Sequence, residues 1–286
     1  MTALLHHLEV PMRSKKSALV HRPARGRRGL SCWMVLPNSV APDAVPLIAV
    51  HGIQRGAYEK ASRLRRRAEA LGRPLIAPLF DRETWPHYQQ LVRKGRADLA
   101  LLALLEELRM EGIWQTSQFD LFGHSGGAQF SHRFAMLYPH LVKRLIVGAA
   151  GWYTFPDATE FPLGLAARQD KRDDWGPRME AGLERFLRLP IRIYVGEHDS
   201  QPDDNTRSGP EIDRQQGLDR LTRAKRWSRA IQEAAKARGL RPDVSLQVLP
   251  GCTHHFSDCI TRSELTHLVL PDSDDIGTAN SKIAKA

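Results

Sequence analysis

Residues 119–127 read FDLFGHSGG. The first part is short and mostly apolar, as a buried strand is, and a helical pattern begins directly after Ser125. The last five letters match G-x-S-x-G, a pattern that requires a sharp strand-to-helix turn exposing the serine hydroxyl. Flanking glycines suit such a turn, and the amino end of the following helix supplies partial positive charge where an oxyanion would form. The stretch therefore predicts a nucleophilic Ser125.

A serine hydroxyl needs a base to remove its proton, and the base needs an acid to orient it. In chains with this motif the order along the sequence is serine, acid, histidine. An apolar run at 191–195 is followed by GEHD, which places Asp199 in a loop after a strand. Its position makes Asp199 the predicted acid, while Glu197, Asp203 and Asp204 remain alternatives.

The predicted base lies after a later apolar run at 244–249, which is followed by PGCTHH. Two adjacent histidines stand in this loop, and the spacing from the glycine favours His254 over His255. The order serine, acid, histidine is then complete. The choice between the two histidines stays open at this point.

A metal site competes for the same loop, because several ligand-type side chains cluster there: Cys252, His254, His255, Asp258 and Cys259. Two neighbouring histidines do not easily face one zinc ion, and no second ligand pair such as C-x-x-C appears in the chain. The ligand count therefore disfavours a metal site.

An oxyanion hole needs a second backbone N–H besides that of the residue after the nucleophile, Gly126. Residues 48–56 read IAVHGIQRG, an early apolar run leading into a glycine turn. Gly52 permits the unusual backbone angles of such a turn. The predicted donor is the N–H of Ile53, with Gln54 as the second choice.

Short apolar runs alternate with helical patterns along the chain. The predicted strands are 30–36, 47–51, 74–79, 119–123, 141–149, 191–195 and 244–249. The predicted helices are 90–110, 126–138 and 218–238. Strands that are apolar throughout and separated by helices favour an α/β fold, in which a mainly parallel sheet is covered on both faces.

The expected organisation is one domain at 30–270, preceded by a basic segment at 1–29 and followed by a polar tail at 271–286. Residues 152–189 and 200–216 are rich in proline or turn residues and follow predicted strands. Such insertions form lids and pocket walls in α/β enzymes. We expect them to make a small cap.

The composition argues against a disordered, a membrane-spanning and a disulfide-bonded secreted protein. The 286 residues are 42% hydrophobic and 26% charged, without low-complexity tracts, which excludes a disordered chain. No apolar stretch approaches the roughly 20 residues that span a bilayer, and no signal-peptide pattern opens the chain. Three cysteines form no disulfide framework, so a bacterial-style cytoplasmic protein is expected. The net charge of +10 is interpreted as a solvated basic face, since no nucleic-acid-binding signature accompanies it.

Taken together, the motifs around Gly52, Ser125, Asp199 and His254 resemble those of the α/β-hydrolase superfamily from about residue 30 to residue 267. The stretch HGIQRGA and the segment at 216–224 look like bacterial esterases near polyhydroxyalkanoate depolymerases. The resemblance implies an eight-stranded, mostly parallel sheet with helices on both faces, and an acyl-enzyme mechanism that needs no cofactor. It also implies a substrate pocket, for which the candidate residues are Gly52, Gln54, His124, Trp152 and Tyr153.

These observations predict a serine hydrolase that cleaves a small ester, lactone or thioester. Acyl transfer, or amide and peptide cleavage, by the same triad is an alternative, as is a non-catalytic protein that binds a ligand. Trp152, Tyr153 and Phe155 either wall the pocket or form core beneath the cap. Arg55 and Arg133 either meet an anionic substrate or pair with structural carboxylates. The expected partner is a small acyl compound, without nucleic acid or a membrane span, and a homo-oligomer is left open.

Overall fold

The computed structural model describes residues 18–26, 28–41, 43–93, 95–168 and 174–272. Its centre is an eight-stranded sheet in the order β1-β2-β4-β3-β5-β6-β7-β8. The strands are β1 (Ala18–Arg22), β2 (Ser31–Leu36), β3 (Leu47–Val50), β4 (Leu75–Leu79), β5 (Phe119–His124), β6 (Val142–Gly148), β7 (Ile191–Gly196) and β8 (Val244–Leu249). β2 runs antiparallel to β1 and β4, and β3 to β8 are mutually parallel. The predicted mainly parallel sheet is confirmed.

β1 has no counterpart among the strands predicted from the sequence. It lies inside the segment 1–29, which was expected to precede the domain, yet all five of its residues pair with β2. It is an edge strand with two-sided exposure, so its residues lack the continuous apolar run that identified the other strands. The remaining part of that segment up to residue 17, and residues 273–286 of the predicted tail, lie outside the described residues.

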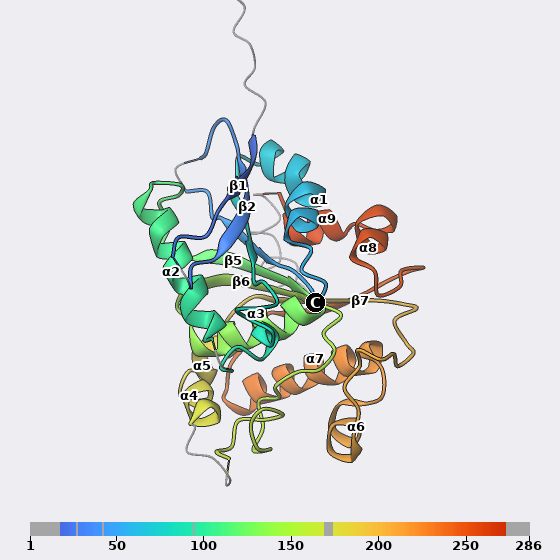
Figure 1. The fold of residues 1–286 in the computed structure, drawn as a ribbon. Helices are drawn as coiled ribbons and strands as arrows, with labels where there is room; N and C mark the ends of the chain where they lie inside the picture. Colours follow the sequence, from blue (N-terminus) through green and yellow to red (C-terminus); the bar gives the residue numbers. More distant parts are fainter. Residues whose placement is uncertain (1–17, 27, 42, 94, 169–173, 273–286) are drawn as a thin grey trace, which may run out of the picture.

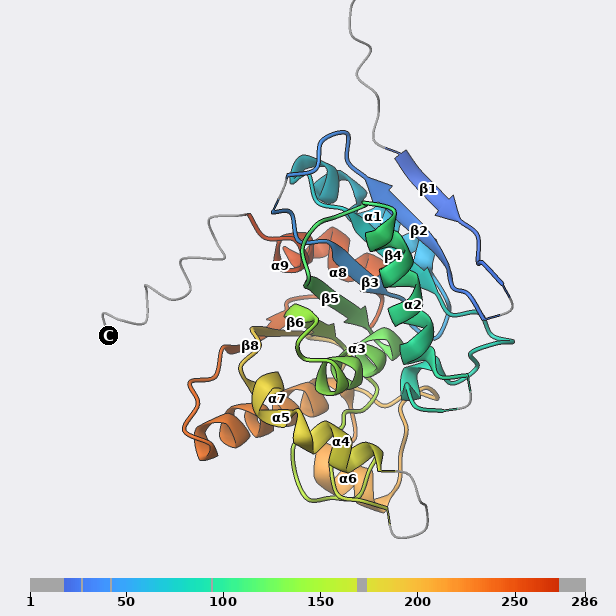
Figure 2. The ribbon, with the colours of Figure 1, turned by 90° about the vertical axis from the view of Figure 1, so that its left-hand side faces the viewer.

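Helices cover both faces of the sheet (Figures 1 and 2). One face carries α1 (Ala57–Ala70), α8 (Phe256–Arg262) and α9 (Leu265–Val269), whose buried residues share a cluster with Leu47, Ala49 and Leu75 of the strands. The other face carries α2 (Ala97–Met110), α3 (Gly126–Leu137) and α7 (Arg220–Ala237) over a larger cluster. Shorter helices are η1 (Tyr88–Gln90), α4 (Trp175–Ala181), α5 (Leu183–Leu187) and α6 (Pro210–Gln216).

Two of the longer helices, α1 and α2, differ from the expectation. The helix predicted at 90–110 begins only at Ala97, because Gly95 (φ 104°) and Arg96 (φ 48°) have left-handed backbone angles that interrupt it. α1 was not predicted, since its buried stripe consists mainly of alanines beside a conspicuous run of arginines. Small inward residues let α1 approach the sheet closely while the arginines face outward.

The two segments expected to form a cap leave the carboxyl ends of β6 and β7. Residues 152–168 contain no helix or strand apart from one bridge between Glu160 and Ala166, and α4 and α5 follow at 175–187. Residues 200–209 are likewise irregular and lead into α6, which lies beside α7 (Figure 1). These segments border the edge of the sheet where Ser125 lies.

Candidate active site

Ser125 lies at the turn between β5 and α3, at φ 57° and ψ −119°. Its N–H donates to the carbonyl oxygen of Gly148 at 2.8 Å, which fixes the turn to the end of β6. A Cβ atom at Gly123 would lie 2.2 Å from the Gly127 oxygen, and one at Gly127 would lie 2.2 Å from the Val50 oxygen. Only glycine fits these two positions, so the glycines of the motif are explained by close backbone approach.

The structure brings Ser125, His254 and Asp199 together from three strand ends. The His254 Nε2 atom lies 3.1 Å from the Ser125 Oγ atom. The opposite ring nitrogen, Nδ1, lies 2.7 Å from the Asp199 Oδ2 atom. Asp199 is 3% exposed, whereas the His254 side chain is 28% exposed, so the acid is buried and the base borders solvent. This is the geometry that proton transfer from serine to histidine requires.

His255 does not face this group. It is exposed at the start of α8, and its backbone N–H donates to the Thr253 hydroxyl. The other members of the cluster that suggested a metal are engaged elsewhere, since Cys252 and Cys259 are buried thiols and Asp258 accepts from Thr253 at 2.9 Å. In the part of the chain that the structure describes, no group of three or more ligand-type side chains is placed to hold a metal ion.

The alternative acids lie away from the imidazole of His254. Glu197 accepts from the Gly251 N–H at 2.9 Å and so holds the loop that carries the histidine. Asp203 pairs with Arg220, and Asp204 is exposed. Burial would raise the pKa of Asp203, but hydrogen bonds from Arg220 and Thr206 outweigh it and lower the pKa to about 2.

Arg220 supports Asp199 from behind. Its Nη1 atom donates to the Asp199 Oδ1 atom at 3.1 Å, and its Nη2 atom donates to the Asp203 Oδ1 atom at 2.7 Å. The Leu221 N–H, in the first turn of α7, also donates to the Asp199 carbonyl oxygen at 3.1 Å. Asp199 therefore accepts one charged bond on each carboxylate oxygen when His254 is protonated. The sequence indicated Arg220 only through the family resemblance.

The predicted oxyanion donors lie next to each other. A Cβ atom built on Gly126 would lie 3.2 Å from the Ile53 nitrogen, and one on Gly52 would lie 3.9 Å from the Ser125 Oγ atom. The Ile53 N–H donates to no backbone carbonyl among the described residues. Gln54, the second choice, is exposed on the same loop.

The buried side chains of His51 and Tyr88 hold the loop that carries Ile53 in place. The Phe80 N–H donates to His51 Nε2 at 3.0 Å, so the ring proton is on Nδ1, which donates to the Gly52 oxygen at 2.8 Å. Burial lowers the pKa of His51 to about 3, which keeps the ring neutral. The Tyr88 hydroxyl donates to the His51 carbonyl oxygen at 2.5 Å. No sequence signal linked Tyr88 to this loop.

His124 was expected to line a substrate pocket, but both of its ring nitrogens are engaged inside the protein. His124 is 4% exposed; its Nε2 lies 2.9 Å from the His254 carbonyl oxygen and its Nδ1 lies 2.8 Å from the Tyr194 hydroxyl. A carbonyl only accepts, so Nε2 carries the proton and Tyr194 donates to Nδ1. Burial lowers the pKa of His124 well below its ordinary value. His124 thus supports the backbone of His254 and does not offer a ring nitrogen to a bound molecule.

The aromatic residues after β6 are buried. Tyr153 is stacked on Trp227 with ring centroids 4.6 Å apart, and its backbone exchanges two hydrogen bonds with the Gln216 side chain. Phe155 belongs to the same core cluster. Trp152 lies in a small separate cluster with Leu163 and Ile212. Of the three, Tyr153 and Phe155 therefore match the alternative of core beneath the cap.

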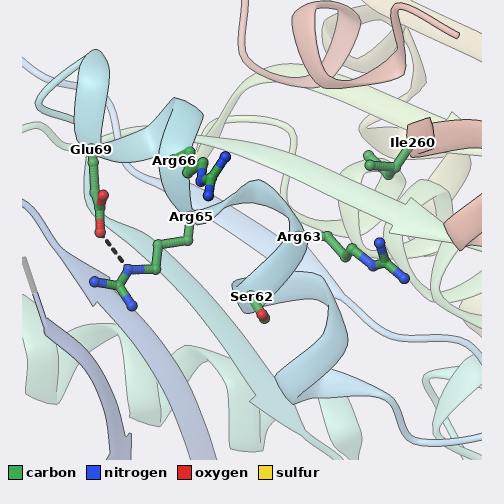
Figure 3. Close-up of a pocket in the computed structure, with 6 residues that line it drawn as sticks. All are labelled: Ser62, Arg63, Arg65, Arg66, Glu69 and Ile260. Carbon is green, nitrogen blue, oxygen red and sulfur yellow. Dashed lines mark hydrogen bonds and ion pairs between the residues drawn. The ribbon is translucent and has the colours of Figure 1, made fainter.

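The run of arginines on α1, at 63 and 65–67, lies away from the residues around Ser125. A hollow of about 690 Å³ opens over the outer side of α1 and is lined by Ser62, Arg63, Arg65, Arg66, Glu69 and Ile260. Figure 3 shows these side chains, with Arg65 turned toward Glu69, to which its Nε donates. None of the residues brought together around Ser125 lines this hollow. The outward position of these arginines agrees with a solvated basic face.

Sequence comparison finds no matching protein-family model and no matching curated protein. Within the described residues, no helix has the length and apolar character needed to cross a membrane. Solved structures match the fold over most of the chain. Poly(aspartic acid) hydrolase-1 from Sphingomonas sp. KT-1 is 23% identical with a TM-score of 0.71, covering 84% of this chain and 93% of that one.

A second match agrees with the resemblance seen in the sequence. LpqC, a poly(3-hydroxybutyrate) depolymerase from Bordetella parapertussis, is 27% identical with a TM-score of 0.71, covering 86% of this chain and 87% of that one. FphF, a fluorophosphonate-binding serine hydrolase of Staphylococcus aureus, is 10% identical with a TM-score of 0.59, covering 90% and 99%. With its eight-stranded sheet and its serine at the strand-to-helix turn, the chain has the α/β-hydrolase fold that these structural neighbours share.

Proposed function

We propose that the protein is a serine hydrolase that cleaves a carboxylic ester through an acyl-enzyme, with Ser125, His254 and Asp199 as the catalytic triad. The observation that carries the proposal is the continuous chain from Ser125 Oγ to His254 Nε2 at 3.1 Å and from His254 Nδ1 to Asp199 Oδ2 at 2.7 Å. The solved structures that this chain resembles include a serine hydrolase and a poly(3-hydroxybutyrate) depolymerase, which supports ester cleavage by a serine.

In the first step, His254 Nε2 takes the Ser125 proton while Oγ attacks the carbonyl carbon of the ester. The oxygen of that carbonyl becomes negative and accepts from the N–H groups of Ile53 and Gly126. His254 then gives its proton to the departing alkoxide, leaving an acyl group on Ser125. Asp199 keeps the imidazole oriented and stabilises its protonated form, without itself taking up the proton.

In the second step, His254 removes a proton from water, and the hydroxide oxygen attacks the acyl carbon. The second tetrahedral intermediate collapses, the proton returns to Ser125 Oγ, and the carboxylic acid leaves. Water is the only co-reactant, so the proposed reaction needs no cofactor. Acyl transfer or amide cleavage would use the same residues, and a panel of acyl donors and acceptors distinguishes these reactions from ester hydrolysis.

We also propose that the protein acts in the cytoplasm on a small acyl compound. The basis is that Cys32, Cys252 and Cys259 are free and buried, as is usual in a reducing compartment. Where in the cell the protein resides is checked by fractionation.

The test of the proposed activity is intact-mass labelling with a fluorophosphonate probe on the wild type and on Ser125→Ala. One adduct on the wild type and none on the folded variant is the expected result. An unlabelled, folded wild type would contradict the proposal and favour a non-catalytic binding protein.

A further inference from the structure

Among the buried arginines that the structure describes, Arg133 alone has no carboxylate partner. The others all pair with a carboxylate: Arg22 with Glu107 and Glu111, Arg73 and Arg144 with Asp120, Arg220 with Asp199 and Asp203, and Arg223 with Asp213. Arg133 is 0% exposed and makes no ion pair within the described ranges. A buried cation without an anion is costly, so this position needs an explanation.

The partners of Arg133 are all neutral. Its Nε atom donates to the Thr154 hydroxyl at 2.9 Å, and its Nη1 atom donates to the carbonyl oxygens of Gln89 at 2.9 Å and Gln129 at 3.1 Å. Its Nη2 atom has no hydrogen-bond partner among the described residues. The guanidinium lies 3.9 Å from the ring centroid of Trp152. The side chain is therefore fixed in place, and one of its donor groups is unused.

A second cation lies at the same indole. The Arg207 guanidinium is 4.9 Å from the Trp152 ring centroid, and Arg207 is exposed on the loop before α6. Burial and the charge of Arg207 lower the pKa of Arg133 to about 9. Two like charges near one aromatic ring repel each other, and an anion placed between them would remove that repulsion.

This pair lies within reach of the proposed catalytic serine. Arg133 follows Ser125 by two turns of α3, and its guanidinium reaches back to Gln129, whose N–H donates to the Ser125 carbonyl oxygen at 3.1 Å. Four residues of helix rise about 6 Å, so the guanidinium is on the order of 6–10 Å from the hydroxyl. Trp152 approaches from the end of β6, the strand whose Gly148 oxygen holds the Ser125 N–H. The separation suits an acyl chain of three to five carbons.

We propose that Arg133, Trp152 and Arg207 form a subsite for a carboxylate at the far end of the acyl group, so that the preferred substrates are monoesters of short dicarboxylic acids. The inference rests on the proposed function, since it assigns the substrate class of the same site. Arg133 and Trp152 are buried, so the exposed Arg207 side chain must turn aside to admit the carboxylate and then close over it.

Selectivity between matched esters tests this subsite. Monomethyl glutarate and methyl pentanoate have similar chains, but only the first ends in a carboxylate. The wild type should prefer monomethyl glutarate by at least about tenfold in kcat/KM. Arg133→Met should lower that ratio by about tenfold or more, because a buried charged partner is lost, and Arg207→Met by about two- to fivefold, because its pair is exposed. Arg66→Met, on the outer side of α1, is the matched control and should leave the ratio unchanged.

Two further measurements separate the subsite from the proposed function. Fluorophosphonate labelling of each variant reports whether Ser125 is active and the protein folded, and Arg207→Met provides a variant that folds even where Arg133→Met does not. Isothermal titration of Ser125→Ala with glutarate reports the subsite without turnover, and saturable binding that Arg207→Met weakens is expected.

Labelled protein that shows no preference for monomethyl glutarate, or the same preference in Arg133→Met and Arg207→Met, would overturn the subsite and leave the serine hydrolase intact. Unlabelled wild type would overturn the hydrolase, and the glutarate titration would then decide the subsite by itself. No saturable glutarate binding at millimolar concentration would overturn it in either case.

Discussion

The support of Asp199 by Arg220 gives a prediction whose magnitude follows from burial. Arg220 is 1% exposed and Asp199 is 3% exposed, and their Nη1 and Oδ1 atoms lie 3.1 Å apart. Arg220→Met keeps most of the apolar stem but removes the charge, which leaves a buried carboxylate with only His254 as a charged partner. Breaking a buried pair from one side costs about 3–5 kcal/mol. We expect that loss in the free energy of unfolding.

The second bond of Arg220 should contribute much less. The Asp203 side chain is 43% exposed, so solvent screens this pair and its contribution is below about 1 kcal/mol. Asp203→Asn is therefore the matched control for Arg220→Met. Because the pKa of Asp203 is lowered from 3.8 to about 2, its stabilising effect is present above about pH 4 and is lost as the pH falls to about 2.

Urea unfolding measures both effects, with kcat/KM for an ester as the companion assay. Arg220→Met should also lower kcat/KM by about tenfold or more, since Asp199 is freed to turn away from His254 while the protein remains folded. A variant that is as stable as the wild type and equally active would refute the reasoning. A larger loss of stability in Asp203→Asn than in Arg220→Met would move the stabilising role to the exposed pair.

Three further predictions concern the two adjacent histidines, Tyr88 and Lys60. His254→Ala should lower kcat/KM by about 10³-fold or more, whereas His255→Ala should stay within about threefold; the reverse pattern would exchange the two histidines. Tyr88→Phe removes the hydroxyl that holds the His51 carbonyl, and should lower both kcat and the fluorophosphonate labelling rate by about tenfold with an unfolding cost near 1 kcal/mol; an unchanged kcat contradicts this. Burial lowers the pKa of Lys60 from 10.5 to about 8, so between these pH values the unfolded chain binds the proton more tightly. The free energy of unfolding of the wild type should therefore rise with pH across that window relative to Lys60→Met, by on the order of 1–3 kcal/mol in urea titrations, and parallel curves would contradict the burial argument.

The sequence by itself determined the class of fold and singled out the residues that meet at the candidate site. Seven apolar runs correspond to β2 to β8. The central strands β3 and β5 are buried on both faces, which favours apolar residues throughout. The residues FGHSGG predict the turn at Ser125, because only glycine permits the backbone contacts found at Gly123 and Gly127. The loops that follow the runs at 191–195 and 244–249 contain Asp199 and His254, the residues predicted as acid and base. These are local signals, and each is readable within a few residues.

Only the tertiary structure decided which side chains meet. His254 and His255 have the same local context, and the direction of the loop after β8 distinguishes them. For Arg133 the sequence left open whether it pairs with a carboxylate, since that depends on residues far along the chain. β1 was missing from the expectation because an edge strand need not be apolar. Contacts between distant segments depend on how the chain packs, and a pattern within one segment contains no information about the segment that it will face.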